Sequence, residues 1–219
     1  MLACFRRCCS DSGTKCRGSE LLPRRIVIAV TGASGAVYGY RLLQKLREQE
    51  NLQIHLVMSR AAEKTSKLEL NLLVKDWKLL SDYSYQIEDI ASRLSSGSFQ
   101  TDGMAICPCS IHTLSAIAMG VSSNLIVRAA DVCLKERRRL VLAVRESPFH
   151  LGHLRAMTAV TEMGAIVAPP IPGFYHKPQT IEDLVDHSVH RIMDLLGVPH
   201  PQTSRWQDIN EDSKDAQQE

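Results

Sequence analysis

The sequence predicts a single α/β domain in which helices cover both faces of a parallel sheet. Short runs such as residues 26–31 and 140–144 are apolar throughout, which is typical of strands that are buried on both faces. Helical patterns of about 10 to 20 residues separate these runs, and such alternation requires right-handed crossovers into a parallel sheet. The 219 residues suffice for one domain of this kind with short tails.

The expected elements alternate along the whole middle of the chain. We expect strands at residues 26–31, 53–58, 103–107, 140–144 and 165–168. We expect helices at residues 35–49, 61–73, 110–118, 124–138, 149–163 and 180–196, whereas residues 74–102 lack a regular pattern. Pro108 is expected to end the third strand, and Gly197 to close the last helix. The predicted architecture is a Rossmann-like (flavodoxin-like) three-layer sandwich.

Composition excludes several classes of function. Hydrophobic residues make up 44% and charged residues 23% of the chain, as in ordinary globular proteins. A net charge of +2 gives no reason to expect nucleic acid, and no apolar run approaches the length of about 18 residues that spans a bilayer. The seven cysteines are an odd number without a secretion signal, which argues against a disulfide framework.

The two ends of the chain differ from its middle. Residues 1–24 are expected to be a disordered or targeting extension, residues 25–198 the α/β domain and residues 199–219 a polar tail. The extension is basic and contains serines, so a mitochondrial presequence is the alternative to a cytoplasmic protein. Asp11 and Glu20 weaken that alternative, because presequences are poor in acids. Trp206 is isolated in the polar tail, so we expect it to pack back on an apolar surface.

The loop Thr31–Gly35 joins the first strand to the first helix and predicts a binding site for a phosphate. A Gly/Ser-rich turn that opens a helix leaves backbone N–H groups pointing outward, at the positive end of the helix dipole. NAD is not favoured, because Ser59, and no acid, follows the second strand and the chain has no Tyr-x-x-x-Lys pair. The loop also lacks a Gly-x-Ser-x-Gly motif, so a serine hydrolase is not expected and Ser34 fits a turn residue.

The third and fourth strands end in further polar residues. Ser110 begins a helix after the third strand, so this loop, like the first, joins a strand to a helix amino terminus that can bind a phosphate. Two such loops together favour a mononucleotide. Cys109 is interpreted as a packed residue because no base for a nucleophile is evident. Arg145 and Glu146 follow the fourth strand, where burial would be costly without a task or a partner. The residues predict a second anion site from Lys135, Arg145 and Arg191. Pairs of histidines three residues apart, at 150/153 and 187/190, lack a third ligand, so no metal is expected.

Four segments resemble the UbiX/Pad family of flavin prenyltransferases. These segments are TGASGAVYG, SSGSFQTDGMAICPCSIHTLSAIA, NLIVRAADVCLKERRRLVLAVRESPFHLGHLRAM and PPIPGFYHKPQTIEDLVDH. The resemblance implies a homododecamer that binds reduced FMN and dimethylallyl phosphate. It implies transfer of the five-carbon unit to flavin N5 and C6, and delivery of prenylated FMN to a UbiD-type decarboxylase. Ubiquinone synthesis and aromatic-acid breakdown both remain open as pathways.

The resemblance also implies roles for individual residues. The cofactor would be bound by Gly32, Ala33, Ser34, Ser59, Ser110, Ile111, His112, Thr113 and Arg145. Glu146 would be the acid–base residue, with Ser34 and Glu69 assisting proton movement. The prenyl phosphate would be bound by Lys135, Tyr175 and Arg191, with Arg128 alongside, and Trp206 would cover the prenyl group.

Two other functions remain open at the level of sequence. The segment Pro108–Thr113 also resembles a loop of phosphopantothenoylcysteine decarboxylase, so an FMN-dependent decarboxylase is one alternative. A non-catalytic flavin-binding subunit of a decarboxylase is the other, although the presence of Lys135, Glu146 and Arg191 speaks against it.

Overall fold

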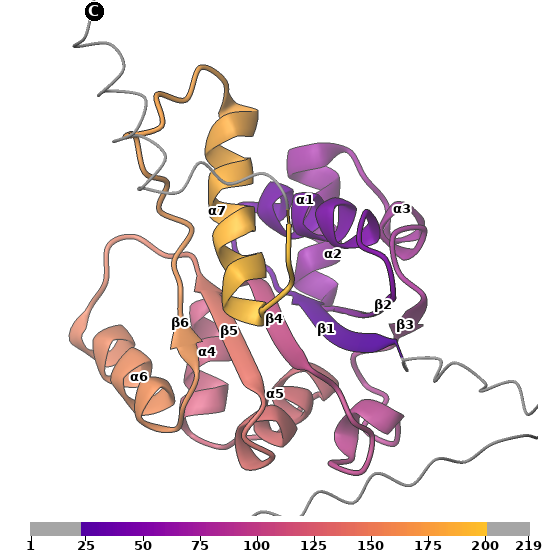
Figure 1. The fold of residues 1–219 in the computed structure, drawn as a ribbon. Helices are drawn as coiled ribbons and strands as arrows, with labels where there is room; N and C mark the ends of the chain where they lie inside the picture. The colour runs from indigo at the N-terminus through magenta and orange to yellow at the C-terminus, as the bar shows by residue number, and fades with distance from the viewer. Residues whose placement is uncertain (1–22, 201–219) are drawn as a thin grey trace, which may run out of the picture.

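The computed structural model describes residues 23–200, which form a three-layer α/β domain (Figure 1). Its sheet has six parallel strands in the order β3-β2-β1-β4-β5-β6. The strands are β1 (Arg24–Val30), β2 (Leu52–Met58), β3 (Tyr83–Tyr85), β4 (Gly103–Cys109), β5 (Arg139–Val144) and β6 (Ile166–Val167). This is the strand order of a Rossmann-type doubly wound sheet, so the predicted fold class is confirmed.

Helices cover the sheet on both faces. One apolar core lies between the sheet and helices α1 (Ala36–Arg47), α2 (Arg60–Leu70), α3 (Val74–Lys78) and α7 (Ile181–Leu196). The other core lies under α4 (Ile111–Ala118), α5 (Leu125–Lys135) and α6 (Leu151–Glu162), with the short 3₁₀ helix η1 (Arg93–Ser95) beside α5. Figure 1 shows α1 and α7 side by side on the first of these faces. The central strands β1, β4 and β5 are largely buried because both faces are covered, whereas the edge strand β3 is partly exposed.

Side-chain caps set where several helices begin. The hydroxyls of Ser59, Ser110 and Thr180 each accept a hydrogen bond from the amide three residues on, as in ordinary N-caps. Thr180 and Asp183 bond reciprocally as a capping box. Gly197 adopts φ 68° and ends α7, a conformation that glycine reaches without strain. The predicted beginnings of α4 and α7, and the end of α7, are therefore confirmed.

The region that lacked a clear pattern contains the elements missing from the sequence prediction. Residues 74–102 hold α3, β3 and η1, so the sheet has six strands where five were expected. β3 has three residues and pairs with β2 alone, which is too short for a detectable alternation. β4 also continues past Pro108 to Cys109, through a register shift after Ile106. The expected end of this strand at Cys107 is therefore wrong by two residues.

The topology places a switch point between β1 and β4. The two strands are neighbours, but α1 follows β1 onto one face of the sheet whereas α4 follows β4 onto the other. The two helices therefore diverge from the carboxyl ends of neighbouring strands. Ligands of doubly wound sheets bind at such a switch point.

A buried histidine occupies the middle of β2. His55 is fully buried, its Nδ1 lies 2.8 Å from the Tyr85 hydroxyl, and its ring stacks on Tyr83 at 5.0 Å between centroids. Burial, with help from the charges of Arg93 and Arg25, lowers the pKa of His55 to about 4. The folded protein therefore holds this imidazole neutral.

We predict that His55 weakens the fold in mild acid. Between pH 6.5 and about 4 the unfolded chain binds a proton at His55 that the folded chain does not, so stability falls over this range, by on the order of 3 kcal/mol. His55→Phe removes that titration while keeping a ring in the stack. Urea unfolding midpoints from pH 7 to 4 should fall less steeply for the variant than for wild type. Equal slopes would contradict the prediction.

Candidate functional site

The carboxyl edge of the sheet gathers the residues expected to bind a cofactor. The loop after β1, the start of α2, the start of α4 and the segment after β5 all lie there, because parallel strands end at a common edge. The structure thus brings together Gly32, Ala33, Ser34, Ser59, Ser110, Ile111, His112, Thr113, Arg145 and Glu146. The loop after β1 approaches α2 closely, since a Cβ on Gly32 would lie 2.4 Å from that of Ala61.

Thr31 connects the loops that follow β1 and β4. Its Oγ1 donates to the carbonyl of Pro108 at 2.8 Å and accepts from the amide of Ser110 at 2.8 Å. Its own amide donates to the same Pro108 carbonyl at 3.2 Å. Thr31 is only 2% exposed, so these bonds are shielded from water. Thr31 was expected in the first loop without a role of its own. The signal in the sequence that could have identified it is a hydroxyl residue directly after a buried strand.

The amino terminus of α1 holds an anion that belongs to the protein itself. The Glu69 carboxylate, from α2, accepts from the amide of Gly35 at 2.9 Å and from that of Ala36 at 2.8 Å. The Ser34 side chain also bonds to this carboxylate. The backbone N–H groups at this helix were predicted to bind a ligand phosphate. The structure corrects this prediction, because the amides of Gly35 and Ala36 donate to the Glu69 carboxylate. Ser34 and Glu69, which were both expected to assist proton movement, therefore lie together.

Glu69 is held in its ionised form. Burial by itself would raise the pKa of Glu69, but hydrogen bonds from Ser34, Ala36 and Gly35 and the positive charge of Arg145 lower it overall. A carboxylate at a helix amino terminus is favoured in the same direction by the dipole. Glu69 is thus an acceptor at neutral pH, close to the charge of Arg145.

Arg145 and Glu146 are exposed at the end of β5. The amide of Arg145 donates to the carbonyl of Cys109 at 3.1 Å, which continues the β4–β5 ladder to the edge. The Arg145 charge acts on Glu69 and on Tyr38, whose pKa is raised chiefly by burial. Glu146 Oε1 accepts from the amide of Ser147 at 2.9 Å. The guanidinium and the carboxylate therefore face the outside of the domain, available to an anion and a proton.

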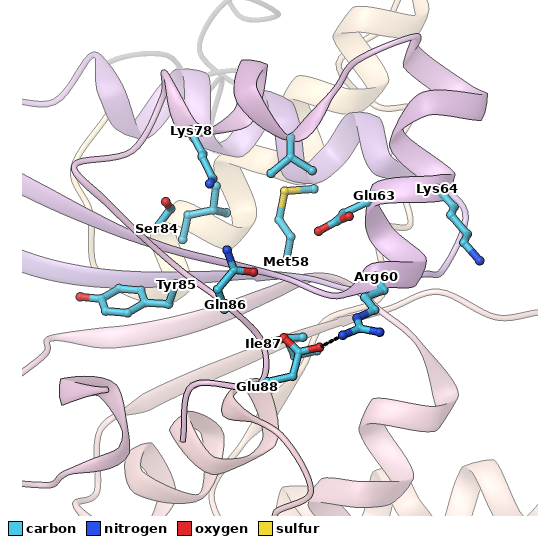
Figure 2. Close-up of a pocket in the computed structure, with 12 residues that line it drawn as sticks. Met58, Arg60, Glu63, Lys64, Lys78, Ser84, Tyr85, Gln86, Ile87 and Glu88 are labelled. Carbon is cyan, nitrogen blue, oxygen red and sulfur yellow. Dashed lines mark ion pairs between the residues drawn. The ribbon is translucent and has the colours of Figure 1, made fainter. Parts of the chain in front are cut away.

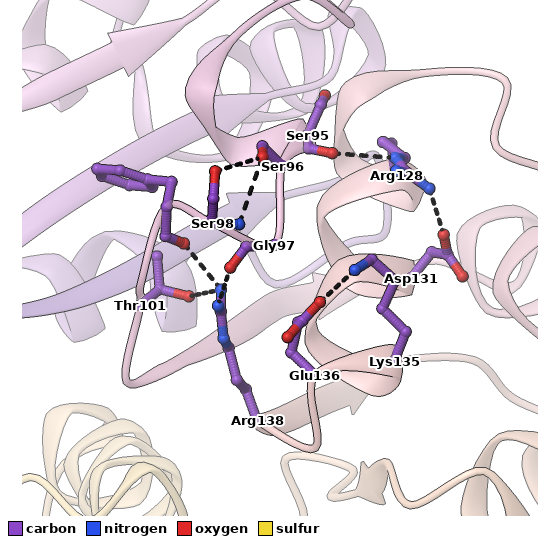
Figure 3. A network of polar contacts seen from close by, with 11 residues as sticks. Ser95, Ser96, Gly97, Ser98, Thr101, Arg128, Asp131, Lys135, Glu136 and Arg138 are labelled. Carbon is purple, nitrogen blue, oxygen red and sulfur yellow. Dashed lines mark hydrogen bonds and ion pairs between the residues drawn. The ribbon is translucent and has the colours of Figure 1, made fainter.

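The structure does not bring Lys135 and Arg128 to this edge. Figure 3 shows both on α5, where Arg128 donates to the Ser95 carbonyl at 3.2 Å and to Asp131 at 2.7 Å, and Lys135 pairs with Glu136. Lys135 lies just before the amino end of β5, while Arg145 follows its carboxyl end. The six residues of that strand separate the two ends by roughly 17 Å. The expected cluster of Lys135 with Arg145 is therefore absent within this chain.

Tyr175 and Arg191 form a separate group along α7. The Tyr175 hydroxyl lies 3.2 Å from His187 Nε2, and His187 stands one turn before Arg191 on the same side of the helix. Arg191 is exposed, and its Nη1 lies 4.0 Å from Oδ2 of Asp194. Since α7 and α5 cover opposite faces of the sheet, Arg191 and Lys135 do not meet in one chain either.

Other expected features have plain outcomes. Cys107, Cys109 and Cys133 are buried free thiols. Burial raises the pKa of the Cys109 thiol well above its usual range, so the interpretation of Cys109 as a packed residue is confirmed. In residues 23–200, no three His, Cys, Asp or Glu side chains gather in a way that could hold a metal ion. Over the same range no helix is long and apolar enough to cross a bilayer. Trp206 and residues 1–22 lie outside the described part of the chain.

A cavity of about 370 Å³ lies next to this edge, lined by residues of β2, α2, α3 and β3 and of the segment that follows β3 (Figure 2). Met58 and Ile87 contribute apolar surface, while Arg60 and Glu88 form an ion pair of 2.6 Å beside them. None of the residues expected to bind cofactor or substrate lines it. The cavity carries charges of both signs.

Helix amino termini that meet at the switch point of a Rossmann-type sheet define a nucleotide-binding α/β protein. The sequence model of the family described as Flavoprotein matches residues 16–193. The flavin prenyltransferase UbiX of Escherichia coli (strain K12) is 50% identical over 186 residues, which cover 84% of this chain and 98% of that protein. The chain belongs to the UbiX family of flavin prenyltransferases.

Solved structures agree with this membership. AnUbiX (PadA1), in complex with FMN and dimethylallyl pyrophosphate, is 48% identical and superposes with a TM-score of 0.78, over 84% of this chain and 99% of the other. A dodecameric FMN-dependent UbiX-like decarboxylase from Escherichia coli O157:H7 is 46% identical with a TM-score of 0.81, over 83% and 98%.

We predict that Glu69 stabilises the start of α1. Glu69→Gln keeps an oxygen acceptor but loses the charge, so the free energy of unfolding should fall by about 1 kcal/mol at pH 7. The folded pKa of Glu69 is lowered, so its contribution is present above the unfolded pKa of 4.5 and is lost as pH falls through the folded value. The difference from wild type in urea unfolding should therefore shrink in acid.

The matched control for this experiment is Glu50→Gln. Glu50 is an exposed carboxylate in the turn between α1 and β2, at the other edge of the sheet. Its replacement should leave unfolding at pH 7 within about 0.5 kcal/mol of wild type. A loss for Glu50→Gln as large as that for Glu69→Gln would remove the role assigned to the Glu69 cap.

Proposed function

We propose that this protein transfers a dimethylallyl group from dimethylallyl phosphate to reduced FMN, at flavin N5 and C6. The observation that carries the proposal is the meeting of the β1 and β4 loops with Arg145 and Glu146 at one edge of the sheet. Membership of the UbiX family, with half of the residues identical over nearly the full length of a relative, supports it. A UbiD-type decarboxylase is the proposed recipient of prenylated FMN.

The residues at this edge fit FMN. Ser110 and Thr113 place hydroxyls at the amino terminus of α4, where backbone N–H groups favour a phosphate. Gly32 lets the backbone of the β1 loop pack closely against Ala61 at the start of α2, which keeps the loop at the carboxyl edge. Ser34 is exposed beside Glu69. FMN would supply the nucleophilic ring positions, and these residues would hold and orient it.

Arg145 and Glu146 suit the chemistry at the prenyl donor. Breaking the carbon–oxygen bond of an allylic phosphate leaves negative charge on the phosphate, which a guanidinium stabilises. The Glu146 carboxylate is exposed next to Arg145 and can exchange a proton with the leaving phosphate or with the flavin. Ser34 and its partner Glu69 would provide a second route for protons.

Lys135 can serve this site only from a neighbouring copy of the chain, because it lies at the amino edge of the sheet whereas Arg145 lies at the carboxyl edge. Arg128 lies two turns earlier on the same helix, where its guanidinium donates to Ser95 and Asp131. We infer a composite site in a homododecamer, in which one subunit contributes Arg145 and Glu146 and another contributes Lys135. The dodecameric assembly of a relative with 46% identity supports this arrangement. A composite site also explains why Lys135 and Arg145 lie far apart within one chain.

Anaerobic incubation with reduced FMN and a prenyl donor tests the proposed reaction. Mass spectrometry of the released flavin should show one added five-carbon unit, with dimethylallyl phosphate and dimethylallyl pyrophosphate tried side by side. Glu146→Gln should lower the rate by roughly 10²- to 10⁴-fold, because a positioned acid–base group is lost. Glu50→Gln, in the exposed turn between α1 and β2, is the control and should react at the wild-type rate.

Two results would overturn the proposed reaction. Unmodified FMN with both donors would exclude prenyl transfer. Release of CO₂ from an aromatic acid by the purified protein, without a partner enzyme, would instead support the decarboxylase function that the name of one relative describes.

The composite site predicts complementation between two inactive variants. Lys135→Ala and Glu146→Gln each damage every site when present in all subunits. In randomly mixed oligomers, roughly a quarter of the sites combine an intact Lys135 with an intact Glu146, so prenylation should return to about that fraction of wild type. Activity that stays at the level of the single variants would contradict a site shared between subunits.

A further inference from the structure

Thr31 sits where the ladder between β1 and β4 stops. The two strands pair in register from Ile26/Gly103 to Ala29/Ile106, and β4 shifts its register beyond that point. No regular strand pairing joins the two loops past this position. The three hydrogen bonds of Thr31 to Pro108 and Ser110 replace it, and two of them involve the side-chain hydroxyl.

This hydroxyl fixes the first residues of α4. Ser110 is the N-cap of that helix, and its amide is held by Thr31 while its own hydroxyl accepts from the amide of Thr113. One residue earlier, the carbonyl of Cys109 accepts from the amide of Arg145. Bonds from Thr31 through the end of β4 therefore connect the β1 loop, the start of α4 and the segment that carries Arg145.

We propose that Thr31 is a positioning residue for the flavin: its buried hydroxyl sets the spacing between the β1 loop and the amino terminus of α4 on which FMN binding depends. This inference rests on the flavin site proposed above. The ligand does not need to touch Thr31, because Gly32, the next residue, and Ser110 form the two sides of the site. A shift of one loop relative to the other would separate groups that must bind one molecule together.

Substitution of the hydroxyl alone tests this role. Thr31→Val keeps the shape and removes the oxygen, which leaves the Ser110 amide without its acceptor. Fluorescence titration of flavin-free protein with FMN should give a Kd roughly tenfold or more above wild type. Thr31→Ser retains the hydroxyl, so its Kd should stay within about threefold of wild type. Thermal unfolding of each flavin-free protein, measured in parallel, gives the folded fraction used to calculate Kd.

Tyr85→Phe is the matched control. It also removes one hydroxyl from a hydrogen bond, that to His55, but on the edge strand β3, which is separated from β4 by β2 and β1. Its FMN affinity should equal that of wild type even if its unfolding temperature falls. Wild-type affinity in Thr31→Val would overturn the proposal. Equal losses in Thr31→Val and Thr31→Ser, or in Thr31→Val and Tyr85→Phe, would do so as well.

The proposed reaction and this positioning role fail in different ways. FMN titration contains no prenyl donor, so wild-type protein that binds FMN but transfers no prenyl group would overturn the reaction and leave the comparison of Thr31 variants intact. Wild-type protein that does not bind FMN would overturn both.

Discussion

The junction between β1 and β4 is the constraint on which the rest of the site depends. The strand order reverses there, so α1 and α4 leave for opposite faces of the sheet. The ladder between β1 and β4 stops at Ala29 and Ile106, before the two loops that follow these strands. Thr31 supplies the missing connection from a buried position, with hydrogen bonds to Pro108 and Ser110. The fold therefore creates the switch point, and one side chain connects the two loops that follow it.

Around this junction, Glu69 caps α1, whereas the start of α4 and Arg145 are left to bind a ligand. Glu69 satisfies the amino terminus of α1, which leaves the amino terminus of α4 as the place where a ligand phosphate meets backbone N–H groups. Arg145 adds a positive charge that acts on Glu69 and is exposed to incoming anions. Lys135 and Arg191 lie over opposite faces of the sheet, so a phosphate site that uses both together with Arg145 requires more than one chain.

Most of the fold could be predicted from the sequence because buried parallel strands and helix caps have strong local signals. The apolar runs identified five strands, and Ser110, Thr180 and Gly197 marked helix ends correctly. β3 was missed because three residues on an edge carry no periodicity. The carboxyl-edge residues followed from topology alone. The separation of Lys135 from Arg145 follows from the strand that lies between them in the sequence, so the spacing already argued against the expected cluster. The hydrogen bonds of the α1 amides to Glu69 and those of Thr31 depend on tertiary geometry, which residue spacing does not encode.

The most direct test of this account is a structure of the assembled protein with FMN bound. The account predicts the flavin between the β1 loop and the start of α4, with contacts to Ser34 and Ser110, and with Lys135 of the partner subunit on the same side as Arg145. A flavin bound elsewhere, for example in the cavity beside Arg60 and Glu88, would contradict it.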